Sequence, residues 1–465
     1  MSTTVEYEYL AASALREAGG RMDLLLATSG GADSASLWPG RAAAAHPFFF
    51  SGFVEHPAVV AQSLLVVARV ARTRFYTPPG MLAAILRAAD PVVTSTPEGL
   101  RFESFSACCG VYARLDVLAE GLDSQFWAAG VTNVDVNPPL RQALAALRPS
   151  EPLRLQVGDD ELRVGTLDGE VVEDKVDLPG RWLKGFAETQ LLSAAMEPRR
   201  ELDAASARRF VQGLPRNSAT KSVMWATGAV RSLRLASGPS KGAVCVAGPE
   251  RLRVVEPLLR YATGLSAFSG EADAASLPMA SGWVLGLPGA RLTVALSPEK
   301  SRGFSGEGGV LPGLAGGTVA DDADLVSAVL AFEPRIAVDA LAAETGLPAR
   351  RVLDALDVLA AAGQVGYDLA AGAYFHRPLP LNPEALAAMH PRLAGARELV
   401  GAGAVVAGAN GGFKVRSGAV DYLVQLSDDG QPDRCTCPWW GKHRGTRGPC
   451  KHVLAARIAA QEDAW

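Results

Sequence analysis

The stretch Arg434–His452, RCTCPWWGKHRGTRGPCKH, holds three cysteines and two histidines, and the cysteines and His452 form two closely spaced pairs. One residue separates Cys435 from Cys437, twelve residues follow, and one residue separates Cys450 from His452. Three thiolates and one imidazole fill the tetrahedral shell of Zn²⁺ and leave no position for water. The pattern therefore predicts a structural zinc site rather than a catalytic one.

The residues around these pairs predict regular elements that hold both halves of the site. Phe413–Arg416 and Asp421–Leu426 are expected to form a hairpin, and the spacing of the first two cysteines places their side chains on one side of a strand. The other two ligands open the apolar helix HVLAARIAA directly after Pro449, whose missing N–H costs little at a helix start. Because zinc would tie a short hairpin to a short helix, its binding energy becomes folding energy.

The sequence offers three alternatives to this ligand set. His443 lies in the gap and is a competing ligand, but His452 is favoured because the helical turn that starts at Cys450 also holds it. Iron–sulfur ligation fits less well with only three cysteines. Three buried free cysteines and an unrelated histidine would require four ligand-type residues to gather within eighteen positions by chance.

The zinc motif lies in a basic segment. From Arg434 to Arg457 the sequence has six lysines and arginines and no aspartate or glutamate. Two interpretations stay open: the basic groups and nearby tryptophans contact a partner, or the rings pack over the zinc site and the charges offset the negative zinc complex. The candidate contact residues are Arg434, Trp439, Trp440, Lys442, Arg444, Arg447 and Lys451.

The runs CTCP at Cys435–Pro438 and GPCKHV at Gly448–Val453, with the hairpin before them, resemble the SWIM zinc finger family. The resemblance implies a ββα unit with Zn²⁺ as cofactor, and roles in DNA binding or protein contact. More widely, the phrases HPFFFSGFVEHP and RVVEPLLRYA resemble bacterial, mainly actinobacterial, SWIM zinc finger proteins encoded near MoxR-type AAA ATPases and VWA-domain proteins. That wider resemblance implies an accessory or regulatory role in such a system.

A second pattern precedes the finger, in a winged-helix-like block at residues 321–382. Three helices followed by a two-stranded wing, QVGYDL and AYFHR, give the element order of a winged helix. The third helix carries Asp354 and Asp357 beside two arginines, a poor match for a helix that reads DNA, so protein contact is favoured. The expected helices are Asp324–Phe332, Val338–Thr345 and Pro348–Ala362.

Composition bounds the class of protein. The chain has 465 residues, 48% of them hydrophobic and 20% charged, and its net charge of −4 leaves any nucleic-acid site to a local patch. Six cysteines are too few for a disulfide framework and indicate a reducing compartment. Because the sequence shows neither a secretory signal nor an apolar run that could span a bilayer, we expect a cytoplasmic protein with no membrane partner.

We predict a multidomain α+β protein. The expected units are a mixed helix and sheet N-terminal domain (1–200), a central strand-rich domain with a Gly-rich linker (201–320), the winged-helix-like block (321–382) and a ββα SWIM zinc finger (395–465). In the first unit the periodicity predicts helices at 1–20, 58–70 and 79–88, and a hairpin region at 153–178 with a turn at Asp168-Gly169. Residues 302–317 are expected to form a loop.

One further motif suggests an enzyme. Ser29–Ser34, SGGADS, matches the phosphate loop of PP-loop ATP pyrophosphatases, but such a loop needs a helix directly after it, and Trp38-Pro39-Gly40 follows here. The alternative function is therefore an enzyme with a nucleotide site near residues 29–34 and the finger as a targeting module. The favoured function is a zinc-binding interaction or regulatory protein whose finger contacts nucleic acid or a protein partner.

Overall fold

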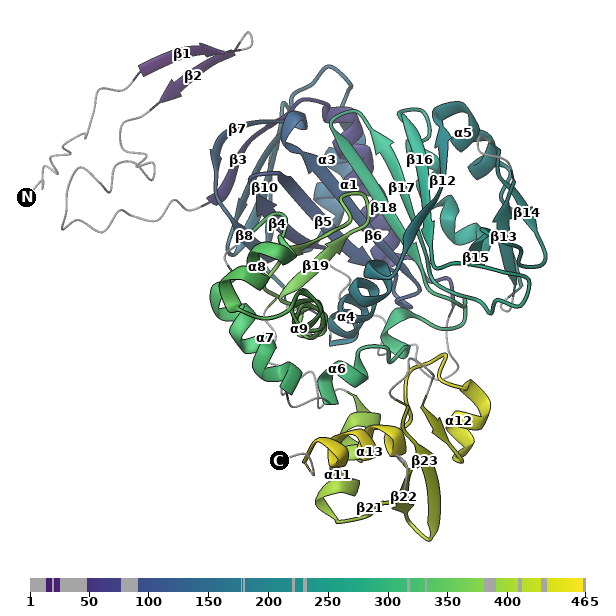
Figure 1. The fold of residues 1–465 in the computed structure, drawn as a ribbon. Helices are drawn as coiled ribbons and strands as arrows, with labels where there is room; N and C mark the ends of the chain where they lie inside the picture. Colours follow the sequence, from purple (N-terminus) through teal and green to yellow (C-terminus); the bar gives the residue numbers. More distant parts are fainter. Residues whose placement is uncertain are drawn as a thin grey trace, which may run out of the picture.

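The computed structural model describes residues 14–18, 21–25, 48–76, 91–176, 178, 180–219, 222–228, 232–315, 318–330, 333–379, 390–408, 412–427 and 433–462. In this part of the chain helices mix with antiparallel sheets of two, five, eight, three, two and four strands, as expected for an α+β protein. Figure 1 shows the C-terminal segment, in yellow, as a lobe below the sheet-rich body. None of the described helices combines the length and apolar character that crossing a bilayer needs.

The largest sheet has the strand order β12-β16-β17-β18-β6-β5-β4-β8 and joins strands from both sides of residue 200. Its centre is the pairing of β6 with β18, in which Leu115 lies opposite Leu292. The strands are β4 (Val92–Thr96), β5 (Gly99–Phe105), β6 (Val111–Leu118), β8 (Gly130–Asn133), β12 (Glu197–Asp203), β16 (Gly264–Ser269), β17 (Ser281–Leu287) and β18 (Ala290–Leu296).

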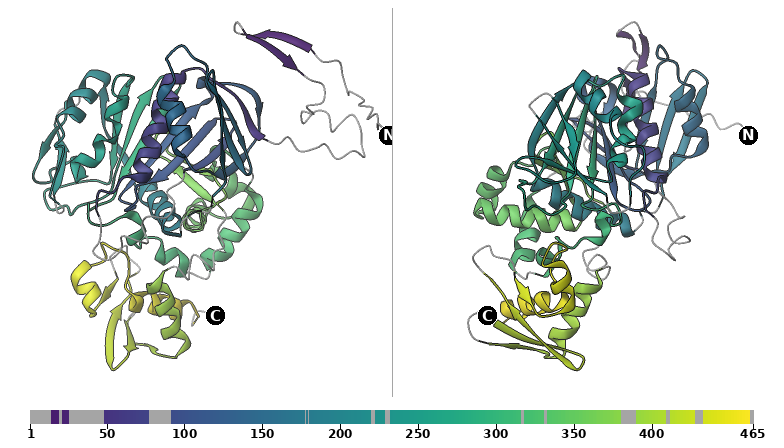
Figure 2. Two further views of the ribbon diagram at one scale, coloured as in Figure 1. Left: turned by 180° about the vertical axis from the view of Figure 1, so that it is seen from behind. Right: turned by 90° about the vertical axis from the view of Figure 1, so that its right-hand side faces the viewer.

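One face of this sheet is apolar and is covered by α1 (Pro57–Arg72), which Figure 2 shows lying across the strands. Pro57 suits the first helical turn because that turn needs no donor from its nitrogen. Leu64 and Val67 of the helix share a buried core with Phe102 and Leu115 of the sheet. The expected helix at 58–70 is thus confirmed.

The remaining sheets and helices complete the body. The hairpin predicted at 153–178 is confirmed, since Thr166 pairs with Gly169 across the expected turn. The five-stranded sheet contains β3 (Phe48–Val54), β7 (Leu122–Trp127), β9 (Arg154–Gly158), β10 (Glu161–Thr166) and β11 (Gly169–Asp174). The three-stranded sheet contains β13 (Val223–Thr227), β14 (Arg234–Ala236) and β15 (Val244–Ala247). Helical segments are η2 (Ala119–Gly121), α3 (Pro138–Ala146), α4 (Gly180–Ala194), α5 (Ala204–Gln212) and η3 (Pro249–Leu258).

Residues 318–376 follow the predicted order of three helices and a hairpin: α7 (Thr318–Val329), α8 (Val338–Thr345), α9 (Ala349–Ala361), β19 (Val365–Asp368) and β20 (Ala373–His376). The hairpin packs against the second face of the large sheet. Phe375 is fully buried, and the Arg101 guanidinium of β5 lies 3.7 Å from the centre of its ring. The wing-like hairpin therefore has a structural partner within the chain.

Buried charges fill this second face. Asp116 and Asp368 are shared by the guanidinium groups of Arg101, Arg114 and Arg291, with N–O distances such as 2.9 Å for Arg101–Asp116 and 3.0 Å for Arg114–Asp368. The alternating polar residues of β5 and β6 therefore meet a second layer of protein. Burial of these charges is tolerated because each carboxylate is paired several times.

Two predictions about the body need correction. Residues 14–18 form a strand, β1 (Ala14–Ala18), paired with β2 (Arg21–Leu25), where a helix over 1–20 was expected. The five backbone pairs from Ala14–Leu25 to Ala18–Arg21 fix these two segments as antiparallel strands. Residues 302–317 are not simply a loop, because η4 (Phe304–Gly306) and α6 (Leu311–Ala315) form there. The helix expected at 79–88 and the motif at 29–34 lie outside the described residues.

Candidate metal centre

The C-terminal lobe is a four-stranded antiparallel sheet with helices on one side. The strand order is β21-β22-β23-β24, and Val424 of β23 pairs with Cys435 of β24. The predicted hairpin and final helix are both confirmed, with an additional strand and two additional helices around them. The elements are α11 (Pro391–Gly401), β21 (Val405–Ala407), β22 (Gly412–Ser417), β23 (Val420–Gln425), β24 (Arg434–Cys435), α12 (Pro438–His443) and α13 (Lys451–Glu462).

The structure brings the four predicted ligands together. Cys435 ends β24, Cys437 caps α12, Cys450 directly precedes α13 and His452 lies in the first turn of that helix. Their ligand atoms lie within 4.8 Å of one another, and none of the four residues is more than 5% exposed. The strand and the two helices thus deliver four metal-binding groups to one buried point.

The donor set fits zinc. Nδ1 of His452 lies 3.8 Å from Sγ of Cys435, and a tetrahedral zinc ion holds sulfur and nitrogen ligands about 3.6 Å apart. Backbone N–H groups of Trp440 and Val453 donate to the sulfurs of Cys437 and Cys450, which favours the thiolate form that binds metal. Four ligands close the shell, so these residues would hold zinc in a structural role.

The surroundings of the ligands fix their ionisation and orientation. The ring of His452 stacks on Tyr422 with centroids 4.3 Å apart, which holds the imidazole in place. The hydrogen bond from Cys435 lowers the pKa of Cys450 to about 4, and the same bond raises the pKa of Cys435. A divalent cation would stabilise all three thiolates.

His443, the competing ligand, lies elsewhere. Its ring packs against Trp439 with centroids 4.4 Å apart, and it is not part of the metal-binding cluster. The choice of His452 from the spacing of the helical turn agrees with this geometry.

The candidate contact residues divide into two groups. The side chains of Arg434, Lys442 and Arg444 are exposed, and within the described residues they form no ion pair. The side chains of the second group make contacts within the protein, and Trp439 and Trp440 belong to this group. Trp439 lies between the guanidiniums of Arg392 at 4.7 Å and Arg447 at 5.1 Å from its ring centre.

The remaining members of that group also have internal contacts. The indole Nε1 of Trp440 donates to the carbonyl oxygen of Asp433 at 2.7 Å. Arg447 donates to the carbonyl oxygen of Gly306 at 2.8 Å, and Lys451 is half-buried. The packing interpretation of the tryptophans is therefore the one that the geometry favours.

Sequence reasoning missed the contact between the lobe and the body. Arg392 of α11 donates to the carbonyl oxygens of Arg447 and Pro449 and also to that of Glu307, at 2.8, 2.9 and 2.9 Å. A Cβ on Gly448 would lie 2.0 Å from the carbonyl oxygen of Gly308, so the two backbones touch there. The glycines of the segment RGFSGEGG and of GPCKH were the available signal, since glycine permits such an approach.

This combination of a small sheet, a helix and a closed shell of three cysteines and one histidine defines a structural zinc finger. Residues 422–461 match the family model of the SWIM zinc finger, so this part of the chain is a SWIM zinc finger and its cofactor is Zn²⁺. A search of curated proteins found no match to the chain.

Solved structures match the chain only distantly. Proliferating Cellular Nuclear Antigen from Entamoeba histolytica is 11% identical with a TM-score of 0.35, and the match covers 54% of this chain and 99% of that one. The PCNA2-PCNA3 complex from Sulfolobus tokodaii is 9% identical with a TM-score of 0.36, covering 54% and 99%. Likeness at this level assigns neither the fold of the body nor a function.

Proposed function

We propose that this chain is a non-enzymatic interaction protein in which a SWIM zinc finger, fixed to a sheet-rich body, binds a partner protein. The observation that carries the proposal is the closed, buried shell of Cys435, Cys437, Cys450 and His452. A zinc ion with four protein ligands has no position for a substrate or a reactive water. Its contribution is to fold and hold the surface around it.

The way in which the finger is mounted supports a docking role. Arg392 and Arg447 bond to backbone oxygens of residues 306 and 307, and Leu311 of α6 lies in the same apolar core as the zinc ligands. A partner bound to the finger would therefore be held in a defined position relative to the body. A finger on a flexible tail would bring the partner near the body without fixing its position.

A protein partner is favoured over nucleic acid. Nucleic-acid binding by a basic finger draws on phosphate contacts and on aromatic rings that stack with bases. Arg434, Lys442 and Arg444 supply exposed charge, but both tryptophans are partly buried, Trp439 beside two guanidinium groups and Trp440 with its Nε1 bonded to Asp433. Assembly with a MoxR-type AAA ATPase or a VWA-domain protein is one form that this proposal takes. The nucleotide-site alternative near residues 29–34 stays a prediction.

The test compares the full chain with two matched variants, Cys437→Ser and His443→Ala, as baits in extracts of the source cells. We expect a partner that the native chain and His443→Ala retain and that Cys437→Ser loses, because of these two residues only Cys437 belongs to the metal-binding cluster. The partner is then identified by mass spectrometry and shown to bind in purified form. A chain whose bound proteins are the same with and without zinc would contradict the proposal.

A further inference from the structure

The finger sheet has one covered face and one open face. Helices α11 and α13 pack on the side that carries Val415 and Val424, which are buried in the core of the lobe. On the other side Val406 is 59% exposed and Leu423 is 61% exposed. Large aliphatic side chains this exposed are uncommon in the described residues, and two of them lie on this single small face.

The strand register aligns the open face into rows. Val406, Lys414 and Leu423 lie directly opposite one another on β21, β22 and β23. Thr436 continues this row beyond β24, since it exchanges two hydrogen bonds of 3.0 Å with the backbone of Leu423. The row therefore crosses three strands and reaches the residue just after the fourth, a width of about 15 Å at the usual strand spacing.

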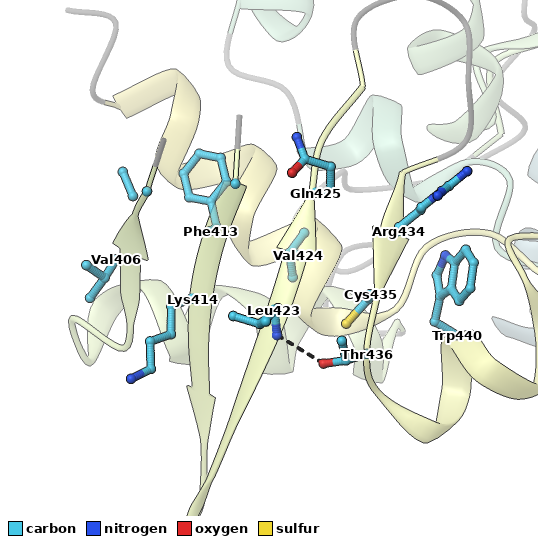
Figure 3. Close-up of a pocket in the computed structure, with 13 residues that line it drawn as sticks. Val406, Phe413, Lys414, Leu423, Val424, Gln425, Arg434, Cys435, Thr436 and Trp440 are labelled. Atoms are coloured by element: carbon cyan, nitrogen blue, oxygen red, sulfur yellow. Dashed lines mark hydrogen bonds between the residues drawn. The ribbon is translucent and has the colours of Figure 1, made fainter. Parts of the chain in front are cut away.

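A groove of about 690 Å³ runs along this row, and Figure 3 shows its lining residues. Gly408 and Gly412 are among its lining residues, and Trp440 lies at the end opposite Val406. The groove is apolar along its floor and open to solvent above. Such a surface fits the apolar side chains of a short extended segment.

Among the described residues, the open face carries more cations than anions. Lys414 and Arg416 share the single carboxylate of Asp421 at 2.8 and 2.9 Å, and Arg434 at the next row has no ion pair among the described residues. Counting only the residues that the structure describes, three cations thus face one anion around an apolar groove. This surplus attracts acidic partners and disfavours cationic ones.

We propose that this groove binds a short acidic amphipathic segment of a partner protein, a proposal that rests on the function proposed above. Apolar side chains of the segment pack against Val406 and Leu423, and its carboxylates pair with Lys414 and Arg434. A second copy of the same face fits poorly, because two copies would bring the same cations together. Single-stranded nucleic acid fits poorly as well, because the row presents Val406 and Leu423, and the two aromatic residues of the lining, Phe413 and Trp440, pack partly into the core of the lobe.

Fluorescence anisotropy on the zinc-loaded full chain tests this with three labelled probes. They are an octapeptide of alternating glutamate and leucine, its counterpart with lysine in place of glutamate, and a twelve-residue oligothymidylate. We expect the glutamate peptide to bind at least tenfold more tightly than the other two, and its affinity to fall as salt is raised. Equal or tighter binding of the lysine peptide or of the oligonucleotide would overturn the proposal.

Two variants locate the site. Leu423→Asp and Lys414→Glu should each weaken binding of the glutamate peptide at least tenfold while zinc content stays at one ion per chain. The matched control is Leu167→Asp, since Leu167 is 66% exposed on the β10–β11 turn of the body, and it should bind as the native chain does. Unchanged affinity in Leu423→Asp would rule out the groove.

The proposed function and the groove can fail separately. If a partner is lost in Cys437→Ser but retained by Leu423→Asp and Lys414→Glu, the finger binds its partner through another surface. If no partner depends on zinc, the docking function itself is wrong, whatever the peptides do.

Discussion

Arg377 and Glu103 form an ion pair in which neither side chain has any exposed surface. Nη1 of Arg377, just after β20, lies 2.6 Å from Oε1 of Glu103 on β5, and the Tyr112 hydroxyl donates to the same carboxylate oxygen at 2.5 Å. The pair connects the hairpin of residues 365–376 to the second face of the large sheet. It therefore holds together parts of the chain that are 274 positions apart.

Removing one member of this pair should be costly. Arg377→Ala leaves the Glu103 carboxylate buried without its cation, which typically lowers the free energy of unfolding by about 3–5 kcal/mol. Urea unfolding followed by tryptophan fluorescence measures the change. The control is Arg350→Ala, whose partner Asp354 is bound at 3.3 Å on an exposed helix face, and it should cost less than about 1 kcal/mol. Equal losses in the two variants would show that the buried pair has no special role.

This pair also shows why the second face could not be read from the sequence. Residues 100–105 and 111–118 alternate apolar and polar side chains, the pattern of a strand with one face in water. The polar face is instead covered by residues that come more than 250 positions later, as the Arg101–Asp368 and Arg114–Tyr367 hydrogen bonds show. The periodicity of a sequence indicates that one face of a strand is polar, but whether that face is exposed depends on segments far away in the chain.

The zinc site was predictable for the opposite reason. Each ligand pair is separated by one residue, so its geometry is fixed locally, although the strand expected to carry both Cys435 and Cys437 ends at Cys435 and Cys437 instead caps α12. The only long-range step is the closing of one pair on the other, and the ligand chemistry itself demands it. The contact that Arg392 makes between the finger and the body was not predictable. Arg392 donates to backbone oxygens, and every residue has one, so the sequence does not indicate which of them it contacts.

A glycine pair tests the contact between finger and body. Gly445 and Gly448 both have left-handed backbones, with φ of 82° and 70°, but only Gly448 lies against another backbone, at the Gly308 carbonyl. Gly445→Ala should therefore cost about 1 kcal/mol of strain, and Gly448→Ala should cost clearly more because the finger must move off residues 306–311. Hydrogen exchange of that segment measures the movement. Faster exchange in both variants, or in neither, would argue against this contact.

Glu188 predicts a pH-dependent stability. Its carboxylate is buried on α4, where it accepts from the Val310 N–H at 3.3 Å, and burial, with a smaller effect of Glu307, raises its pKa from 4.5 to about 8. The native state thus keeps a proton that the unfolded state releases above pH 4.5. The free energy of unfolding must therefore fall as pH rises from about 4.5 to 8.

Glu188→Gln should remove this component, because the amide oxygen still accepts from Val310 and carries no charge. We expect the variant and the native chain to be nearly equal in stability at pH 5, and the variant to be more stable at pH 8. Urea unfolding at pH 5, 6, 7 and 8 gives the difference, and Glu344→Gln at an exposed position of α8 is the matched control. A difference that is constant with pH would mean that Glu188 is ionised in the native state throughout.

Loss of a single ligand should unfold the finger and leave the body intact. Cys437→Ser removes one of the four predicted zinc ligands and the cap of α12, so we expect zinc to be released. The finger would then lose the folding energy that zinc supplies, which is on the order of 10 kcal/mol for small zinc units. Zinc content by mass spectrometry and limited proteolysis measure the two effects. We expect cleavage within residues 390–462 and protection of residues 91–176, because the cores of the two regions are formed by different residues.

The matched variant for this experiment is His443→Ala, which removes a second histidine of the same segment. His443 packs on Trp439 and is not in the cluster, so this variant should keep a full zinc content and lose only ring packing, about 1 kcal/mol. Zinc loss in His443→Ala with retention in His452→Ala would reverse the ligand assignment. Retention of zinc in Cys437→Ser would mean that three ligands suffice, and then the site would have an open position and the structural role would no longer follow from its geometry.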